Sequence, residues 1–223
     1  MAGEQRPSPA PQEPPAPDAG ERAAAERLFG DRLVLTERYV AHLASSGIVR
    51  GLIGPREVPR LWGRHVLNCA VLEEHIPSGA SVVDVGSGAG LPGLCLALAR
   101  PDLRLTLVEP LERRVQWLEE VVADLGLGNV RVLRSRAEQA VDEVGEVDVV
   151  TARAVSALVG LVDITLPLLR GTGELLALKG RSAADEVRKA RMKLERYGVR
   201  SVEVVTAGEE LLAEPTTVVR VRL

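Results

Sequence analysis

The sequence predicts an α/β domain built on a doubly wound parallel sheet and preceded by a helical cap. From Ser81 onward, short runs rich in Val and Leu alternate with helix-length segments, a pattern typical of parallel strands covered on both faces. A glycine-rich turn follows the first of these runs, as expected at the ligand-binding edge of such a sheet. With 223 residues, of which 46% are apolar, the chain can bury one full core but hardly two.

The first 76 residues are expected to form a leader and a cap. Residues 1–20 are rich in Pro and Ala and offer little apolar surface to offset the entropy of ordering, so we expect a disordered leader. Residues 21–76 should form the helical cap, because apolar side chains recur three and four residues apart from Glu21 to about Ser46 and again from about Pro55 to Glu74. The pair Gly54-Pro55 marks the start of the second stretch.

Residues 77–223 should form the sheet domain. Seven strands are expected, at residues 81–85, 104–109, 130–134, 147–151, 173–179, 200–206 and 216–222. Helices are expected between the first five strands, at residues 91–99, 111–125, 137–143 and 156–169. The last two strands are joined only by residues 207–215, which is too short for a parallel crossover, so they should pair antiparallel. The sheet is therefore expected to be mostly parallel with an antiparallel last strand.

The glycine-rich turn contains the spacing of a dinucleotide-binding loop, but in the wrong register. Gly88-Ala89-Gly90-Leu91-Pro92-Gly93 satisfies G-x-G-x-x-G. In a nicotinamide enzyme the strand runs directly into the first glycine, whereas here the strand ends at Gly86, two residues earlier. Asp84, just before the turn, also fits poorly beneath a pyrophosphate. We therefore expect a ligand that carries positive charge.

Composition excludes several classes of protein. With 28 basic and 31 acidic side chains, the chain is no overall polycation, so any contact with nucleic acid must come from local patches. Cys69 and Cys95 have no partners at metal-ligand spacing, which favours buried thiols in a reducing compartment and no metal site. No apolar run approaches the roughly 20 residues that span a bilayer, and the N-terminus lacks a secretory signal. We expect a cytoplasmic protein without membrane contact.

The segment Asp84-Val85-Gly86-Ser87-Gly88-Ala89-Gly90 resembles the first motif of the class I methyltransferases, which bind S-adenosyl-L-methionine. The resemblance implies that Gly86, Gly88 and Gly90 let the backbone approach the cofactor, while Asp84 supports the loop and the amino-acid end of the cofactor. Glu109 closes the second strand, 23 residues after Gly86, where that family places a carboxylate on the ribose hydroxyls. The alternative for these residues is a tight turn and a solvated strand end.

A narrower resemblance covers most of residues 55–180. Its motifs are Arg64-His65 with Asn68, Gly90-Leu91-Pro92-Gly93-Leu94, Leu107-Val108-Glu109-Pro110 followed by Arg113-Arg114, Arg136-Ala137-Glu138, Thr151-Ala152-Arg153-Ala154-Val155 and Lys179-Gly180. In this order they resemble the RsmG family, also called glucose-inhibited division protein B. Members methylate N7 of a guanine in the 530 loop of 16S ribosomal RNA. One difference is Asn68-Cys69, where the family commonly has Asp-Ser.

The resemblance to RsmG implies cofactor contacts at Gly86, Leu91, Ala137, Glu138 and Arg153. Ala137 and Glu138 follow the third strand, where class I enzymes bind adenine through a backbone N–H and a carboxylate. The alternative for Glu138 is a favourable charge at a helix N-terminus. Arg153 should lie just past the fourth strand and is the candidate for positioning substrate or cofactor, since a guanidinium can stack on a base or hold a phosphate. The alternative is an ordinary surface arginine.

The implied reaction explains why the sequence shows no catalytic triad. Guanine N7 carries a free lone pair and no proton, so methyl transfer needs no general base, and positioning can supply most of the acceleration. We therefore assign no proton-transfer residue. His65 is expected to pack or to form hydrogen bonds rather than to act in acid–base catalysis.

Contacts with RNA are expected from groups of basic residues. The candidates are Arg64, Arg113, Arg114 and Lys179, with Arg56 and Arg60 near the cap and Arg181, Arg188, Lys189, Arg191 and Lys193 after Lys179. Each group could instead be an ordinary solvated face. An aromatic content of 2% argues against a broad stacking platform for single strands.

Three hypotheses for the function remain at this point. The first is a 16S rRNA guanine-N7 methyltransferase that acts on RNA of the small ribosomal subunit as a monomer. The second is a class I methyltransferase with a small-molecule or protein acceptor, and the third is a module that binds cofactor or nucleic acid without turnover. The arginines clustered in the helical cap favour the first over the second.

Overall fold

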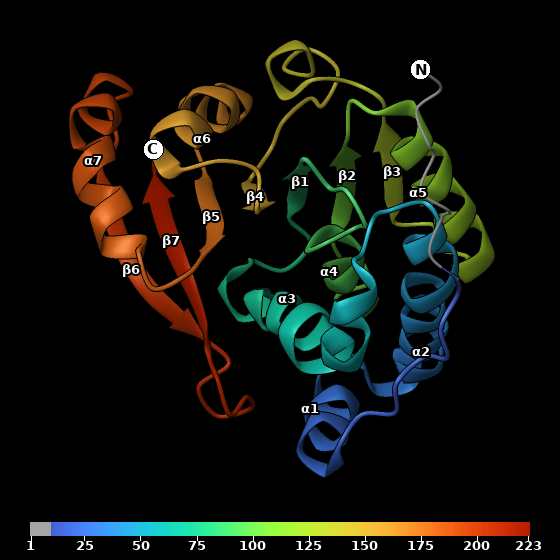
Figure 1. The fold of residues 1–223 in the computed structure, drawn as a ribbon. Coiled ribbons are helices and arrows are strands. Elements are labelled where there is room, and N and C mark those ends of the chain that lie inside the picture. The colour runs from blue at the N-terminus through green and yellow to red at the C-terminus, as the bar shows by residue number, and fades with distance from the viewer. Residues whose placement is uncertain (1–9) are drawn as a thin grey trace, which may run out of the picture.

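The computed structural model describes residues 10–223, which build one seven-stranded sheet with helices on both faces (Figure 1). The strands are β1 (Ser81–Val85), β2 (Arg104–Val108), β3 (Val130–Leu133), β4 (Val149–Arg153), β5 (Glu174–Lys179), β6 (Ser201–Ala207) and β7 (Thr216–Arg222). Their order in the sheet is β3-β2-β1-β4-β5-β7-β6. The strands from β1 to β5 pair in parallel, and β7 pairs antiparallel with both β5 and β6. The predicted fold class and the antiparallel pairing of the last two strands are confirmed.

The fourth strand lies two residues further along the chain than predicted. The expected range was 147–151, whereas β4 runs to Arg153, because residues 152 and 153 still pair with Ala177 and Leu178 of β5. Before the strand, Asp148 bridges its two neighbours: its N–H donates to the carbonyl of Ser81, and its carbonyl accepts from the N–H of Glu174. Arg153 is therefore the last residue of the strand rather than the first residue beyond it.

Each face of the sheet has its own core. One core joins side chains such as Val82, Leu105 and Val149 to the cap and to helices α4 (Gly93–Ala99) and α5 (Glu112–Leu125). The other joins side chains such as Val83 and Val150 to α6 (Leu158–Thr165) and α7 (Ala183–Arg196). Since successive side chains of a strand point to opposite faces, the apolar strands supply both cores at once.

Three of the expected helices differ from the prediction. The helix expected at 137–143 is reduced to a 3₁₀ turn at Ala137–Gln139, because only Ala137 and Ala140 of this segment are buried. The helix expected at 156–169 is divided into α6 and a 3₁₀ segment, Leu166–Leu169, since Pro167 cannot continue an α-helix. Helix α4 begins at Gly93 rather than at residue 91, directly after Pro92.

The cap is helical, as predicted, but it is not built from two continuous α-helices. Its first half contains α1 (Ala19–Phe29), a 3₁₀ turn at Gly30–Arg32, α2 (Leu33–His42) and a π turn at Leu43–Gly47. Its second half consists of a 3₁₀ segment (Pro55–Arg60), a π segment (Leu61–Leu67), α3 (Asn68–Ala70) and a 3₁₀ segment (Val71–His75). Pro59 lies inside this half and disfavours a regular helix there.

The described part of the expected leader, residues 10–18, runs without regular structure to the start of α1. It contacts the cap, because Trp62 Nε1 donates to the carbonyl of Pro15 at 2.9 Å and the N–H of Gln12 donates to the carbonyl of Ala44 at 3.0 Å. Helix α1 starts two residues earlier than expected, since the Asp18 side chain caps it by accepting from the N–H of Glu21. Residues 1–9 lie outside the described residues, and the division into leader, cap and main domain stays a prediction.

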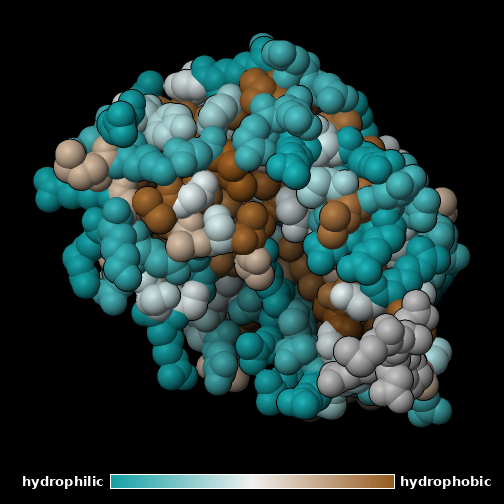
Figure 2. Space-filling model, turned by 45° about the horizontal axis from the view of Figure 1, so that its top comes forward, coloured by the Kyte–Doolittle hydropathy of each residue, from teal (hydrophilic) through white to brown (hydrophobic). Residues whose placement is uncertain are grey.

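The face of the molecule seen in Figure 2 is mostly polar. Figure 2 shows hydrophilic residues over most of one face of the molecule, with hydrophobic residues gathered in a few patches between them. Within residues 10–223, no helix has both the length and the apolar character needed to cross a membrane.

Candidate active site at the carboxyl edge of the sheet

The candidate site lies where the order of strands reverses. β1 pairs with β2 on one side and with β4 on the other, so the chain leaves these strands in opposite directions along the sheet. Ligands of open α/β sheets bind at such a switch point, outside the carboxyl ends of the strands. The glycine turn after β1, Glu109 after β2 and Arg153 at the end of β4 all occupy this edge.

The glycine turn is held to the end of β2 by its backbone. The N–H of Gly86 donates to the carbonyl of Val108 at 2.8 Å, and the N–H of Gly88 donates to Oε2 of Glu109 at 3.0 Å. Gly88 has a φ of +55°, and among the described residues a Cβ built on it would meet only the carbonyl oxygen of Gly86, at 3.7 Å. The turn therefore leaves open space beside Gly88, into which a ligand can approach the backbone.

Asp84 lies beneath this turn and is fully buried. Its Oδ2 accepts from the N–H of Gly93 at 3.1 Å, and its Oδ1 accepts from the hydroxyl of Thr151 at 3.1 Å. Burial raises the pKa of Asp84 to about 7, although its hydrogen bonds favour the ionised form and oppose this rise. A cation bound at the turn would stabilise the ionised carboxylate.

Glu109 is buried as well, with 1% of its surface exposed, so it is not a solvated strand end. Its two carboxylate oxygens accept from the backbone N–H groups of Gly88 and Leu111, each at 3.0 Å. Each oxygen retains a second lone pair that can accept from a ligand hydroxyl. Glu109 therefore fixes the turn.

A cavity of about 240 Å³ opens beside the turn. It is lined by Leu52, Ile53, His65, Gly86, Ser87, Gly88, Ala89, Leu91, Arg114, Arg153 and Ala154. These residues come from the cap, the glycine turn, α5 and the end of β4. The cap therefore forms one wall of the candidate site.

Arg153 connects the sheet to the cap. Its Nη2 lies 2.6 Å from Nδ1 of His65, and its Nη1 donates to Sγ of Cys69 at 2.9 Å. It is therefore not an ordinary surface arginine. Burial and the positive charge of Arg153 lower the pKa of His65, which is accordingly neutral at physiological pH.

The other candidate cofactor residues lie along the same edge. Leu91 lines the cavity, whereas Gly90 packs against Leu94 of α4. Ala137 is buried and Glu138 is exposed in the turn that follows β3. The structure thus gathers Gly86, Gly88, Leu91 and Arg153 around one cavity and places Ala137 and Glu138 two strands away from β1.

The four candidate RNA contacts differ in how free they are. Arg113 is exposed, and Arg64 is exposed with its Nε 3.6 Å from Oε2 of Glu57. Arg114 lines the cavity, and its Nη1 lies 3.6 Å from Glu109.

Lys179, the fourth candidate, is bound within the protein. Its Nζ lies 2.9 Å from Oε2 of Glu186 and donates to the carbonyl of Ser156 at 2.7 Å, and only 9% of its side chain is exposed. A phosphate contact at Lys179 would have to break this ion pair. Through Ser156 and Glu186, Lys179 connects the loop before α6 to the start of α7.

Sequence reasoning missed Tyr39 as part of the site. Tyr39 belongs to the apolar pattern of α2 and is fully buried, but its hydroxyl donates to the carbonyl of Ala89 in the glycine turn at 2.6 Å. Buried tyrosine hydroxyls normally need a polar partner, which is the one signal the sequence contained. Tyr39 thus connects α2 directly to the turn.

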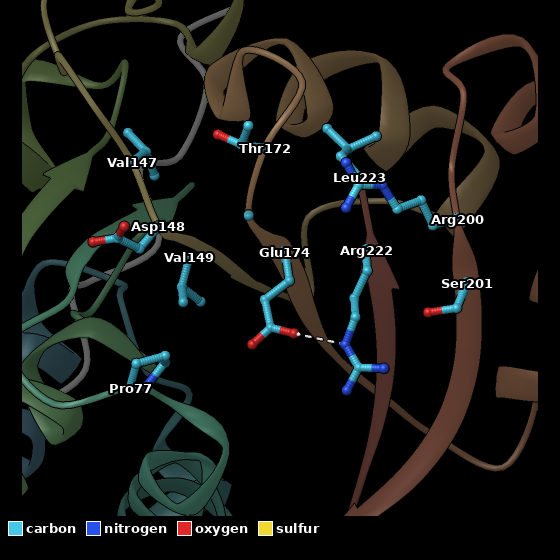
Figure 3. A pocket seen from close by; sticks show the side chains of 11 residues that line it. Pro77, Val147, Asp148, Val149, Thr172, Glu174, Arg200, Ser201, Arg222 and Leu223 are labelled. Atoms are coloured by element: carbon cyan, nitrogen blue, oxygen red, sulfur yellow. Dashed lines mark ion pairs between the residues drawn. The ribbon is translucent and has the colours of Figure 1, made fainter.

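A second cavity, of about 420 Å³, lies at the opposite, amino end of the parallel strands (Figure 3). Its most prominent pair is Glu174 and Arg222, whose side chains point toward each other, with Nε of Arg222 3.4 Å from Glu174. Arg220 also donates to the same carboxylate. The Glu174 carboxylate is therefore paired with two arginines. The residues of the sequence motifs lie instead at the carboxyl ends of the parallel strands, where the first cavity opens.

Comparison with solved structures agrees with the fold. A predicted O-methyltransferase from Agrobacterium tumefaciens matches 70% of this chain and 79% of its own, with a TM-score of 0.55 and 14% sequence identity. The precorrin-6y C5,15-methyltransferase of Geobacter metallireducens matches 76% of this chain and 89% of its own, with a TM-score of 0.51 and 18% identity. At these identities the likeness concerns the fold alone.

Comparison of sequences is more specific. The "Ribosomal RNA small subunit methyltransferase G" of Pseudarthrobacter chlorophenolicus is 67% identical over 91% of this chain and 94% of its own. That of Rhodococcus jostii is 57% identical over 90% of this chain and 88% of its own. The family model described as "GidB: rRNA small subunit methyltransferase G" matches residues 33–214, which include the cap from α2 onward and every strand of the candidate site. This chain therefore belongs to the GidB family of rRNA small subunit methyltransferase G proteins.

Proposed function

We propose that this protein is an S-adenosyl-L-methionine-dependent methyltransferase that methylates N7 of a guanine in the 530 loop of 16S ribosomal RNA. The observation that carries the proposal is the cavity bounded by the glycine turn, the cap and Arg153, in a chain 67% identical to a ribosomal RNA small subunit methyltransferase G. The buried carboxylates of Asp84 and Glu109 support the glycine turn at that cavity.

The residues at the edge fit this cofactor. Open space beside Gly88 permits close approach to the backbone, and Asp84 favours a ligand with positive charge. Glu109 has lone pairs for the ribose hydroxyls, while Ala137 and Glu138 are proposed to bind the adenine through a backbone N–H and a carboxylate. When bound, the cofactor supplies a methyl group on a sulfonium.

The chain's own residues then hold the guanine and exclude water. N7 needs no base, because it attacks with a free lone pair, so the expected contribution is alignment at near-attack distance. Arg153 is proposed to position the base or an adjacent phosphate, since His65 and Cys69 hold its guanidinium at the cavity. Leu52 and Ile53 cover the cavity from the cap side.

The substrate guanine should be unstacked when it binds. N7 faces the deep and narrow major groove of A-form RNA, which side chains do not reach, so a base in a loop or turned out of its stack is required. Arg113 and Arg114 at the start of α5 are proposed phosphate contacts beside the cavity. Arg64 is exposed and, with Arg60, is proposed to contact RNA phosphates at the rim of a groove of about 660 Å³, whose lining also includes the acidic Asp18, Glu21 and Glu214.

The deciding experiment uses small-subunit RNA from a strain that lacks this gene. The RNA, free or in assembled particles, is incubated with the protein and labelled cofactor and then cleaved chemically at 7-methylguanine. We expect one new cleavage, in the 530 loop. Methylation of another base, or label recovered only in protein or small molecules, would contradict the proposed acceptor.

The monomeric state and the absence of a metal are also part of the proposal. Light scattering of the purified protein tests the monomeric state, and elemental analysis tests the absence of a metal. Fractionation of cells tests the cytoplasmic location.

Binding of the cofactor should release a proton at Asp84. The free protein holds this carboxyl partly protonated near pH 7, since its pKa is about 7, and a bound cation favours the ionised form. Affinity for the cofactor should therefore rise as pH increases through about 7 and level off above it. Calorimetry in two buffers of different ionisation enthalpy measures the proton release. Asp84→Asn, which cannot ionise, should release fewer protons, and equal release by both proteins would exclude Asp84 as the source.

A further inference from the structure

A line of hydrogen bonds runs from the surface of the cap to the cavity. Oε2 of Glu57 lies 2.9 Å from Nε2 of His65, and Nδ1 of His65 lies 2.6 Å from Nη2 of Arg153. Glu57 is partly exposed, whereas His65 is buried. The line therefore links the accessible 3₁₀ segment Pro55–Arg60 to a guanidinium that lines the candidate site.

The chemistry of the two ends fixes the tautomer of the imidazole. An ionised carboxylate can only accept, so Nε2 of His65 must carry the proton that it donates to Glu57. Nδ1 is then the acceptor, and it faces a guanidinium, which can only donate. The opposite tautomer would bring an N–H against Arg153 and leave Glu57 facing a lone pair.

The charged groups around this line of hydrogen bonds favour the same tautomer of His65, with its proton on Nε2. The His65 hydrogen bond lowers the pKa of Glu57, which is therefore ionised. Arg64 lies near the same carboxylate, with its Nε 3.6 Å from Oε2. Because burial and the charge of Arg153 lower the pKa of His65, its Nδ1 is free to accept.

Arg153 is held at a second point by the same segment of the cap. Nη1 donates to Sγ of Cys69 at 2.9 Å and to the carbonyl of His65 at 3.4 Å. His65 and Cys69 are four residues apart, so both reach the guanidinium from one face of the helical segment. Two fixed N–H groups leave the planar guanidinium little freedom to rotate.

We propose that Glu57 and His65 are positioning residues that lock Arg153 in the orientation needed to bind cofactor and substrate. This inference rests on the proposed function, because it assigns the binding role to Arg153. Glu57 accepts from Nε2 of His65 and so selects the tautomer with the proton on Nε2. Nδ1 of His65 is then left to accept from Arg153. Neither residue needs to touch the reacting atoms.

The first test reads the tautomer directly, in protein labelled with ¹⁵N at histidine. The ¹⁵N shifts of His65 should be those of a neutral ring with the proton on Nε2. In Glu57→Gln the amide can donate as well as accept, so the shifts should move toward a mixture of tautomers. A matched control is Asp124→Asn, since Asp124 lies 2.9 Å from Nε2 of His42 in a pair of the same kind on the surface. This control should change only the His42 signals. A proton on Nδ1 of His65 in the wild-type protein would overturn the proposal.

The second test compares two replacements of His65 by calorimetry with S-adenosyl-L-methionine. Asn places an amide oxygen near the position of Nδ1 and can still accept from Arg153, whereas Leu cannot. We expect His65→Leu to lower the affinity about tenfold, as for the loss of a charge-assisted hydrogen bond, and His65→Asn to stay within about threefold of the wild type. His75→Leu, a replacement of another cap histidine, controls for lost packing.

The outcomes separate positioning from simple packing. Equal losses in His65→Asn and His65→Leu, or wild-type affinity in a folded His65→Leu, would overturn the positioning role. The calorimetric test needs no RNA, so a wild-type protein that binds the cofactor but leaves 16S RNA unmethylated would contradict the proposed function without affecting this result. Absence of cofactor binding in the wild type would overturn the proposed function itself.

Discussion

Replacement of Arg153 by alanine should lower methyl transfer to small-subunit RNA about 100-fold or more, the size of effect expected when reacting groups lose their alignment. Arg153 is the last residue of β4, and its guanidinium lies at the cavity. There His65 and Cys69 bind the guanidinium and fix its position. Alanine removes the charged group and both of these bonds. The measurement is the single-turnover rate with labelled cofactor at saturating RNA, together with thermal unfolding of the variant.

Two further variants separate this effect from lost stability. Arg153→Lys keeps the charge, but a single ammonium cannot reproduce the planar fork that meets Nδ1 of His65 and Sγ of Cys69, so activity should fall well below the wild type. Arg220→Ala removes a partly buried arginine that bonds Glu174 at the opposite edge of the sheet. It should lower the unfolding temperature and leave the transfer rate unchanged. Wild-type activity in a folded Arg153→Ala protein would remove Arg153 from the site.

The sequence predicts the order of helices and strands well, because the pattern of apolar residues within each segment indicates its type. The first strand is placed correctly at both ends, since the valine-rich segment Ser81–Val85 stops at Gly86, whose φ of +68° ends the strand. The short connection between β6 and β7 likewise requires their antiparallel pairing. Local patterns are enough wherever a strand or turn depends on neighbouring residues.

Other features depend on contacts that no local pattern contains. The insertion of β7 between β5 and β6 is set by pairing across the sheet. The end of β4 at Arg153 depends on its register with Leu178. The expected helix at 137–143 fails because its apolar residues find too little burial beyond Ala137 and Ala140.

The candidate site shows the same division. Asp84 and Glu109 could be found from the sequence, because each stands at the end of a strand and parallel strands end at one edge. The bonds of Arg153 to the cap join residues 88 and 84 positions apart, so no spacing could predict them. For the same reason, the sequence could not show that Lys179 forms an ion pair with Glu186.

Replacement of Gly88 by valine should abolish binding of S-adenosyl-L-methionine while the protein stays folded. Within residues 10–223, a Cβ at Gly88 would meet only the carbonyl oxygen of Gly86, at an ordinary contact distance of 3.7 Å, so the new side chain meets no wall of the core and instead fills the approach to the cavity. The φ of +55° adds backbone strain, on the order of 1–2 kcal/mol for a side chain with a Cβ. A domain stable by about 5–15 kcal/mol tolerates such a cost. Calorimetry should show affinity reduced by at least about 100-fold, equivalent to roughly 2.7 kcal/mol.

Gly126→Val separates strain from obstruction of the site. Gly126 follows α5 with a φ of +63°, and no atom of the described residues 10–223 lies within 4 Å of a Cβ placed there, so valine meets the same strain in open space outside the cavity lining. Both variants should lose similar stability in denaturant unfolding, but only Gly88→Val should lose the cofactor. The N–H of Gly88 also donates to Glu109, so a shifted turn would disturb the proposed ribose contact as well. Normal affinity in Gly88→Val would mean that the ligand does not approach the backbone at this turn, and the glycine spacing after β1 would then reflect the strand-to-helix connection alone.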